Sequence, residues 1–533
     1  MLWILVAAAS VARLALLIVR PLWHDEIFTL WASRLPSSRL LEVLRQDSGP
    51  PLFYLVEKPF VRLAEMAQSD ALARLLPFAA VLCLFVPARR LSRESARIWF
   101  VALAAGSPLL LVSAGEARAY GLLALLDFAL FFLLFRGEPS RGRLAGAAAL
   151  TALALWTHYL AILFVAACAL LLIVRRRFLC LAALCVGMLA FLPWIPVLTV
   201  QPRQATAWMR EPLGDSLLAF VSSLGGAGRI PSPQGGPLPG ILVTIGLLVA
   251  IALLVAVARA GRQDPESADA AALSLLTMLL VLAASLLRPV AFAGRSEIAI
   301  LPIWLWSVSR AATAGRMARW VTAASVAVGA VAALLLMAAP KPVPSSSRAV
   351  ALVRQLATRE DRVIATAAFY LPARLAYDRG TLAAPVTPIP RELASHPGWF
   401  AQAPLSREDL QALDQALATF SGNRRAFLLL HPFFLTPEMV QRLAGRGRSE
   451  VLFERPDALV IVWTSGPASA LPKGAPSSPA KGKRTLGRSS EESGDPSRVI
   501  GQGKRLLSER SPGATFRRAA ATALRASRVA GST

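Results

Sequence analysis

Long apolar runs separated by short polar stretches fill the first 340 residues of the chain. A transmembrane helix needs about 20 consecutive apolar residues, and about eleven runs approach that length. They lie near residues 1–20, 71–88, 97–113, 119–135, 144–157, 159–174, 178–199, 238–258, 270–287, 298–314 and 320–339. The pattern predicts a mainly α fold, a polytopic membrane protein of about 11 transmembrane helices.

Two of these runs need interpretation. The fifth and sixth form one apolar stretch interrupted only by Thr157-His158-Tyr159, which we interpret as a tight reversal between two helices. Residues 1–20 lack a basic leading segment and a cleavage site of the A-x-A type, so we interpret them as an uncleaved first helix.

Clusters of arginine between the runs predict the orientation of the chain. Short loops rich in Arg and Lys stay in the cytoplasm. The clusters are Arg89/Arg90/Arg93/Arg97, Arg136/Arg141/Arg143, Arg175–Arg177, Arg259/Arg262 and Arg310/Arg316/Arg319. Placing all of them inside assigns every span without conflict. The outer segments are then 21–70, 114–118, 157–159, 200–237, 288–297 and everything after residue 340.

Two of the outer segments are long. Within residues 21–70, Pro50-Pro51 precedes the apolar stretch Leu52–Val56, which predicts an amphipathic segment along the membrane surface. Residues 201–237 are rich in Gly and Pro and are either a flexible lid or an ordinary connector.

The chain changes character after residue 340. Short apolar runs at 362–366, 425–430 and 459–463 predict strands, and helical patterns lie near 347–358, 407–419 and 437–445. We expect a membrane domain at 1–340, a small extracytoplasmic α/β domain at 341–464 and a disordered basic tail at 465–533.

Composition supports a membrane protein. Of 533 residues 55% are hydrophobic and 17% charged, and the mean hydropathy is +0.54, values outside the range of soluble proteins. The net charge of +25 does not indicate a nucleic-acid partner, because much of it lies in short loops between apolar runs. Cys83, Cys168, Cys180 and Cys185 all fall inside apolar runs, which predicts neither disulfides nor a zinc site.

Polar residues able to do chemistry gather on the predicted outer face. Trp23-His24-Asp25-Glu26 follows the first run, and a carboxylate there can act as a general base on a hydroxyl. The alternative is structural, since Asp25 and Glu26 would also suit the start of a short helix over 27–32.

Further candidates follow other runs. Asp47 precedes the Pro50-Pro51 pair, and Glu116 and Tyr120 are four residues apart, so on a helix they share a face while Arg118 points elsewhere. Glu116 would otherwise pair with Arg118 or a neighbouring arginine.

The last two candidates are His158 and Arg295. His158 is a proton carrier or a hydrogen-bonded histidine at the membrane interface. Arg295 is a phosphate binder or half of an ion pair with Glu297.

Together these motifs resemble the membrane glycosyltransferases of the GT-C fold, in the branch of bacterial protein O-mannosyltransferases and aminoarabinose transferases (glycosyltransferase family 39/83-like). The resemblance covers residues 1 to about 340. It rests on Asp25-Glu26, Asp47 with Pro50–Tyr54, Arg74, Glu116–Tyr120, Thr157–Tyr159 and Arg295–Pro302, where Ser296 stands at a position that is often tyrosine.

The resemblance implies a donor, an acceptor and roles for the residues. A sugar would pass from a polyprenyl-phosphate donor to a hydroxyl of a glycan, lipid or protein with inversion. Asp25 would be the base, and Glu26 would position the acceptor or the sugar. Arg118 and Arg295 would stabilise the leaving phosphate. Tyr120 and His158 would line the substrate site. Asp47 and Glu116 would bind sugar or acceptor, or hold a divalent metal ion if one is used.

Two other classes of protein compete with this interpretation. A polytopic transporter or lipid flippase would place ionisable residues near mid-membrane, whereas the candidates here lie at one face. A non-catalytic assembly or sensor protein would explain the outer domain but not the grouped motifs. The abundance of Ala, Arg and Leu favours a bacterial origin, hence a multi-pass protein of the inner (plasma) membrane with its site facing the periplasm or exterior.

Overall fold

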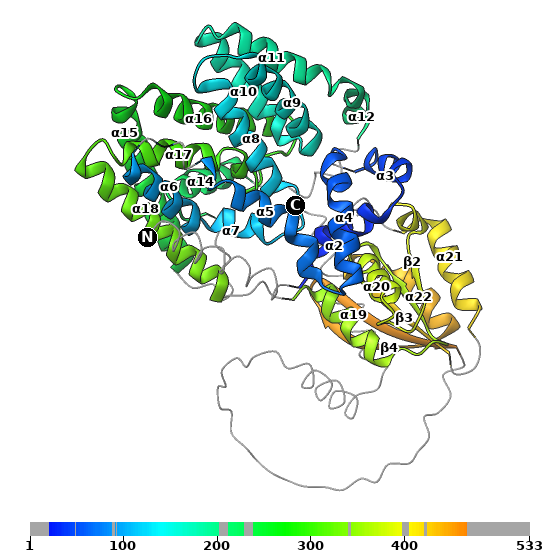
Figure 1. Cartoon of the computed structure of the whole chain (residues 1–533). Coiled ribbons are helices and arrows are strands. Elements are labelled where there is room, and N and C mark those ends of the chain that lie inside the picture. The colour runs from blue at the N-terminus through cyan, green and yellow to red at the C-terminus, as the bar shows by residue number, and fades with distance from the viewer. Residues whose placement is uncertain are drawn as a thin grey trace, which may run out of the picture. The chain divides into compact units, whose positions relative to one another are not determined.

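The structure, a computed structural model, describes residues 21–47, 49–87, 91, 93–201, 212–228, 238–338, 343–396, 405–420 and 424–465. The predicted first helix (1–20) and the basic tail (466–533) lie outside these residues. The chain divides into two units, residues 1–342 and 343–533. The first is helical and the second contains the sheet (Figure 1).

The described part of the first unit begins with three helices, where the sequence predicted an outer segment with one amphipathic stretch. They are α2 (His24–Arg34), α3 (Ser37–Leu44) and α4 (Leu52–Met66). Helix α4 starts directly after Pro51, as the proline pair predicted. It packs on α2 and on the short helix η1 (Asp70–Arg74), which leads into α5 (Leu75–Cys83).

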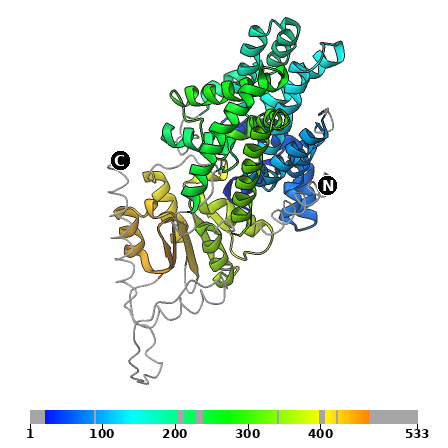
Figure 2. The same ribbon diagram turned by 90° about the vertical axis from the view of Figure 1, so that its left-hand side faces the viewer.

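Apolar helices form most of the remaining described residues of the first unit. They are α6 (Glu94–Gly106), α7 (Pro108–Ala114), α8 (Tyr120–Phe135), α9 (Arg141–Thr157), α10 (Leu160–Val174), α11 (Phe178–Leu189), η3 (Leu192–Trp194), α12 (Ile195–Val200), α14 (Leu213–Leu224), α15 (Leu238–Gly261), α16 (Pro265–Ser285), η4 (Ser296–Ala299), α17 (Leu301–Ala311) and α18 (Arg316–Ala338). The predicted reversal is present, because α9 ends at Thr157 and α10 begins at Leu160. Figure 2 shows the same bundle from the side.

Among the described residues, α15, α16 and α18 are long and apolar enough to span a membrane. Two bent pairs, α6 with α7 and α11 with η3–α12, raise the number of candidates from three to five. The other predicted spans that lie within the described residues correspond to shorter helices, so the count of eleven stays a prediction. The described helices and the small sheet establish a mainly helical, multi-pass membrane protein.

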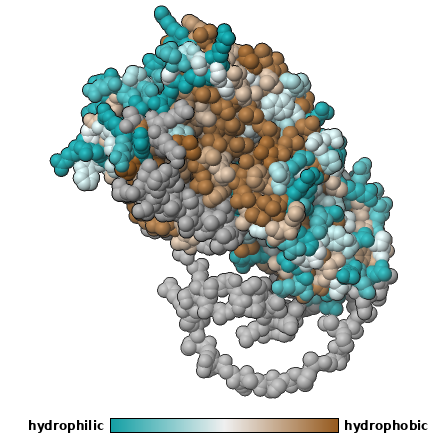
Figure 3. All heavy atoms as spheres, viewed as in Figure 1, coloured by the Kyte–Doolittle hydropathy of each residue, from teal (hydrophilic) through white to brown (hydrophobic). Residues whose placement is uncertain are grey.

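The outer surface of these helices is apolar, as lipid contact requires. Figure 3 shows hydrophobic residues over the middle of the helical unit and hydrophilic ones at its end. On α15, exposed apolar side chains recur every three or four residues at Ile241, Ile245, Leu248, Ile251 and Val255.

Residues 201–237, expected to be a lid or connector, contain helix α14. The Gly225-Gly226 pair that suggested a loop instead ends this helix where it meets α15. A Cβ on Gly225 would lie 1.9 Å from the Gly246 carbonyl oxygen, so only glycine permits this close approach.

The second unit has a five-stranded sheet in the order β2-β1-β3-β5-β4. The strands are β1 (Arg362–Ala365), β2 (Val386–Pro388), β3 (Arg425–Leu430), β4 (Gly447–Arg455) and β5 (Ala458–Ser465). Strands β1–β3 are parallel, and β5 is antiparallel to β3 and β4. The predicted strands coincide with β1, β3 and β5. Strands β2 and β4 were not predicted, because β2 has only three residues and β4 is a half-exposed edge strand.

Helices contribute apolar side chains to both faces of this sheet. They are α19 (Ser345–Leu356), α20 (Ala367–Asp378), α21 (Arg407–Ala418) and α22 (Pro437–Arg446). Val363 and Ala365 pack with α19 and α20, while the intervening Ile364 packs with α21 and α22. This alternation is the two-residue period of a strand buried on both sides.

Candidate active site

Asp25 lies where three distant parts of the first unit meet. Its Oδ2 atom is 3.3 Å from Nη1 of Arg295 and 3.8 Å from Nη2 of Arg118. The Asp25 side chain is almost fully buried, at 6% exposure, while the two arginine side chains keep 17% and 21%. One carboxylate therefore stands against two cations that remain partly accessible.

Helix α2 aims Asp25 at this point through its neighbour Glu26. The Glu26 carboxylate accepts hydrogen bonds from Nε and Nη2 of Arg74 at 2.7 and 2.8 Å. It also accepts the backbone N–H groups of Ala117, at 2.9 Å, and Trp23, at 3.3 Å. The Glu26 and Arg74 side chains are each 1% exposed. Glu26 thus ties the first turn of α2 to η1 and to the turn before α8.

The structure accordingly gives Glu26 a different environment from the one expected. The sequence suggested that both neighbouring carboxylates face substrate. Because successive residues of a helix point in different directions, Asp25 meets the arginines while Glu26 turns into the protein. The structural alternative, that both acidic residues lie in the first turn of a helix, is also present, since α2 starts at His24.

Aromatic rings surround the Arg295 guanidinium. It lies 4.6 Å from the ring centre of Trp23, 5.2 Å from that of Phe292 and 5.5 Å from that of Tyr120. Nη1 also approaches the Tyr120 hydroxyl at 3.5 Å. Burial opposes its charge, but Tyr120 and Asp25 outweigh this and raise the pKa of Arg295. The rings hold a flat cation in one orientation, with nitrogen atoms directed at Asp25.

Arg118 and Tyr120 come from a turn, which corrects the helical spacing that we expected. Residues 115–119 form turns and bends and α8 begins at Tyr120, so Glu116 and Tyr120 are not one helical turn apart. The Arg118 N–H donates to the Glu116 carbonyl at 2.7 Å, which closes the turn. Arg118 therefore points to the same place as Tyr120 and not away from it.

Glu116 is buried within electrostatic reach of Arg74 and Arg295. The expectation that it pairs with Arg118 or a neighbouring arginine is consistent with this position. Glu297, the other expected partner of Arg295, accepts hydrogen bonds from the Gly294 N–H at 3.0 Å and the Ser223 hydroxyl at 3.4 Å. Arg295 itself contacts Asp25.

Tyr54 and Asp47 complete the side of Arg118 that faces α4. Arg118 hydrogen-bonds to the side chain of Tyr54, whose pKa burial and Asp47 raise above its usual value. Asp47 also acts electrostatically on Arg118, whose pKa is raised because Asp25 and the tyrosines outweigh its burial. Tyr54 was quoted in the motif but not predicted as a site residue.

His158 lies against Tyr120, with ring centres 5.2 Å apart. Its Nδ1 atom accepts the backbone N–H of Leu160 at 3.1 Å. Burial and the charges of Arg118 and Arg295 lower the pKa of His158 to about 3. The ring is therefore neutral at physiological pH, which favours the hydrogen-bonded histidine over the proton carrier. His24, half-buried, opens α2 beside the site.

Glu57 on α4 is a buried carboxyl that sequence reasoning missed. It is fully buried, and neither oxygen has a hydrogen-bond partner among the described residues. Burial and the charge of Glu26 raise the pKa of Glu57 to about 9. The signal was available, because Glu57 interrupts the buried stripe Phe53, Val61 and Ala64 at helical spacing.

The carboxylates of the site do not form an evident metal site. Among the described residues, no group of three or more His, Cys, Asp and Glu side chains could hold a metal ion. The chemistry available from these residues is a carboxylate base and two cations fit to bind an anion such as phosphate.

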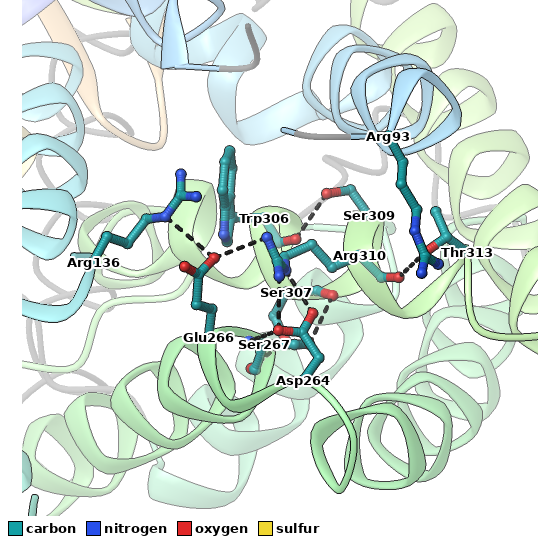
Figure 4. A network of polar contacts seen from close by, with 10 residues as sticks. All are labelled: Arg93, Arg136, Asp264, Glu266, Ser267, Trp306, Ser307, Ser309, Arg310 and Thr313. Atoms are coloured by element: carbon teal, nitrogen blue, oxygen red, sulfur yellow. Dashed lines mark hydrogen bonds and ion pairs between the residues drawn. The ribbon is translucent and has the colours of Figure 1, made fainter. Parts of the chain in front are cut away.

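A second charged cluster, drawn in Figure 4, joins the start of α16 and the end of α17 to Arg136, which follows α8. Arg310 binds Asp264 at 2.6 Å and Glu266 at 2.9 Å, and Arg136 binds Glu266 at 3.2 Å. Helix α8 carries Tyr120 at its start and precedes Arg136 at its end. Since an α-helix rises about 1.5 Å per residue, this cluster is about 24 Å from the site along α8.

Comparison with known proteins gives the fold. No family model and no curated protein matches the sequence. Two crystal structures of ArnT from Cupriavidus metallidurans match the structure, one in the apo state and one bound to undecaprenyl phosphate. The apo structure has 15% sequence identity and the bound one 14%; each has a TM-score of 0.54 and covers 86% of this chain and 97% of its own. The chain therefore has the GT-C fold of these transferases.

Proposed function

We propose that this protein is a membrane glycosyltransferase that moves a sugar from a polyprenyl-phosphate donor to an acceptor hydroxyl. The observation that carries the proposal is the meeting of Asp25 with Arg118 and Arg295. A base for the acceptor and two cations for a phosphate stand together on a fold shared with ArnT. A lipid-linked donor also agrees with the undecaprenyl phosphate bound in one ArnT structure.

In the proposed reaction Asp25 orients the acceptor hydroxyl and takes its proton. The hydroxyl oxygen attacks the anomeric carbon from the face opposite the phosphate, so the configuration inverts. The new bond forms between that oxygen and the anomeric carbon, and the bond from the anomeric carbon to the phosphate oxygen breaks. The polyprenyl phosphate leaves with the bonding electron pair.

Arg118 and Arg295 stabilise the negative charge that develops on the leaving phosphate. Their partial exposure supports this role, because a substrate anion can reach them. Charge stabilisation of this kind is strongest in a site that excludes water. Asp47 and Tyr54 lie on the side of Arg118 that faces α4, where we propose that sugar or acceptor hydroxyl groups bind.

Glu26 has a supporting role in this proposal. The Glu26 carboxylate accepts four hydrogen bonds, from the Arg74 side chain and from the backbone N–H groups of Ala117 and Trp23, so these contacts hold it within the protein. We propose that the Glu26–Arg74 pair fixes α2 against the turn that carries Arg118. Glu116 lies near both Arg74 and Arg295 and would keep these cations balanced when the substrate phosphate is absent.

The site belongs on the outer side of the membrane in this proposal. Helix α8 begins at the site and ends before Arg136, Arg141 and Arg143, one of the basic clusters that indicate the cytoplasm. In a bacterium the site would face the periplasm or exterior. Residues 341–464, which follow the last predicted transmembrane span, would lie on that side as well.

The test is sugar transfer from radiolabelled polyprenyl-phosphate sugars by protein in reconstituted membranes. Asp25→Asn should reduce transfer about 10³-fold, within the range of a lost general base. The matched control is Asp215→Asn, an exposed carboxylate on α14, which should behave as wild type. Full transfer by Asp25→Asn would reject the proposed base. Lipid that changes leaflet without any sugar transfer would favour a flippase.

A further inference from the structure

A chain of hydrogen bonds, partly buried at Tyr159 and buried at Gln201, runs beside the proposed site. The indole N–H of Trp194 donates to the Tyr159 hydroxyl at 2.9 Å. That hydroxyl donates to Oε1 of Gln201 at 2.8 Å. The side-chain amide of Gln201 then donates to the backbone carbonyl of Leu44 at 2.7 Å. The chain connects η3, the reversal before α10, the residue after α12 and the end of α3.

Its last member also holds the turn that carries Asp47. The Leu44 carbonyl accepts the backbone N–H of Asp47 at 3.3 Å as well as the Gln201 amide. The last carbonyls of a helix lack partners within the helix and take them from side chains or water. Leu44 is fully buried and Gln201 is 4% exposed, so water cannot readily replace the amide.

Asp47 in turn belongs to the site. Its charge acts on Tyr54, Arg118 and Tyr159. Arg118 hydrogen-bonds to Tyr54 and lies 3.8 Å from Oδ2 of Asp25. Asp47 therefore interacts with Arg118 through its charge and with the hydrogen-bond chain through its backbone N–H, which donates to Leu44.

One short reversal supports both sides of the site. His158 contacts the Tyr120 ring, and Tyr120 in turn contacts Arg295. The next residue, Tyr159, reaches through Gln201 to Leu44 and the Asp47 turn. A shift of this reversal would move the cation and Asp47 together.

We infer that Gln201 and Tyr159 are positioning residues, which act through the Leu44 carbonyl to hold Asp47 at the substrate site. This inference rests on the proposed function for its catalytic consequence but not for the geometry. Neither residue touches the reacting atoms. Displacements of about 1 Å remote from the chemistry can reduce a rate about 10²-fold, which is the scale on which such residues act.

The first test needs no turnover. Hydrogen exchange is measured on peptides covering residues 41–52 in Tyr159→Phe and in Gln201→Met, which keep the ring and the side-chain length. Both variants should exchange about tenfold faster at the amides of Gln46 and Asp47, the effect of losing one buried hydrogen bond. Tyr377→Phe on α20 removes a half-exposed hydroxyl elsewhere and should leave this segment unchanged. Unchanged exchange in both site variants would overturn the inference.

The second test asks whether the effect passes through Asp47. Gln201→Met should lower kcat/KM for sugar transfer about 10- to 100-fold in the wild-type background. In the Asp47→Asn background, Gln201→Met should lower kcat/KM by less than about a further twofold, because the effects of coupled residues are not additive. Equal losses in both backgrounds would indicate general damage and reject the positioning role. If the wild type transfers no sugar, the proposed function fails, and the exchange measurement alone decides the inference.

Discussion

Oδ2 of Asp25 lies 3.3 Å from Nη1 of Arg295, although 270 positions separate the two residues in the sequence. Helix α2 and the segment before η4, far apart in the sequence, therefore meet at this contact. The guanidinium also lies over the rings of Trp23 and Tyr120, so the contact fixes the orientation of the cation as well as its position. A substrate phosphate that entered here would share Arg295 with Asp25.

The first prediction concerns the shape of this cation. Arg295→Lys should lower kcat/KM for sugar transfer about 10²-fold, because an ammonium cannot both lie flat between aromatic rings and direct paired N–H groups at a phosphate. The kinetics of sugar transfer and the affinity for polyprenyl phosphate would measure this loss. The matched control is Arg374→Lys, which changes an arginine over the Tyr377 ring in the second unit and should have no effect. Wild-type kinetics for Arg295→Lys would contradict the proposed phosphate contact.

The second prediction concerns the buried pair of Glu26 and Arg74. Glu26→Gln should destabilise the protein by about 3–5 kcal/mol, because it removes the negative charge that is hydrogen-bonded to the buried Arg74 guanidinium. Thermal unfolding in detergent would detect the change. The double variant Glu26→Gln/Arg74→Met should lose less than the sum of the single changes. Additive losses would mean that the two residues do not act as a pair.

The third prediction is a pH dependence caused by Glu57. Burial and the charge of Glu26 raise the pKa of Glu57 from its ordinary value of 4.5 to about 9 in the folded protein, so the folded state binds the proton more tightly than the unfolded state. The contribution of the protonated Glu57 to the free energy of unfolding is therefore present in full below about pH 4.5. It is lost progressively as the pH rises to about 9.

The variant Glu57→Gln, which cannot ionise, should therefore be more stable than wild type at pH 8, and the difference should vanish near pH 5. Thermal midpoints measured between pH 5 and 9 would show it. Glu65→Gln, on the same helix but half-exposed and paired with Arg34, is the control and should not change the pH profile. Parallel profiles for wild type and Glu57→Gln would show that Glu57 ionises normally.

The fourth prediction separates stability from activity. Asp264 accepts two hydrogen bonds from Arg310 and caps α16 through the Ser267 N–H at 3.4 Å. Asp264→Ala should lower the free energy of unfolding by about 1–2 kcal/mol. The change removes a helix cap and one of the two ion-pair partners of Arg310, which keeps its contact with Glu266. Sugar transfer should stay within about twofold of wild type, because this cluster lies at the opposite end of α8.

Asp264→Asn is the matched variant, since an amide oxygen can still cap the helix. It should lose less stability than Asp264→Ala in the same thermal unfolding assay. A large loss of transfer in a folded Asp264→Ala protein would indicate that the two ends of the bundle are coupled.

The pattern of apolar and polar residues along the sequence determined many of the helices and strands of this protein. It predicted the reversal at Thr157–Tyr159, the helix after Pro51 and the three main strands, because helices, tight reversals and buried strands each have a local pattern. It also predicted that Asp25, Arg118 and Arg295 lie on the same face of the membrane. Polar residues at the ends of apolar helices have few places to lie except the membrane surface, so a count of helices groups them.

Only the tertiary structure decided what each of these residues contacts. Asp25 and Glu26 are adjacent and chemically alike, yet one faces two accessible arginines and the other is enclosed by Arg74 and backbone N–H groups. The turn over residues 115–119, the burial of Glu57 and the hydrogen bond from Gln201 to Leu44 depend in the same way on neighbours far away in the sequence. A local pattern records which face of a helix is apolar, whereas the partner of a buried polar group is set by the packing of whole helices.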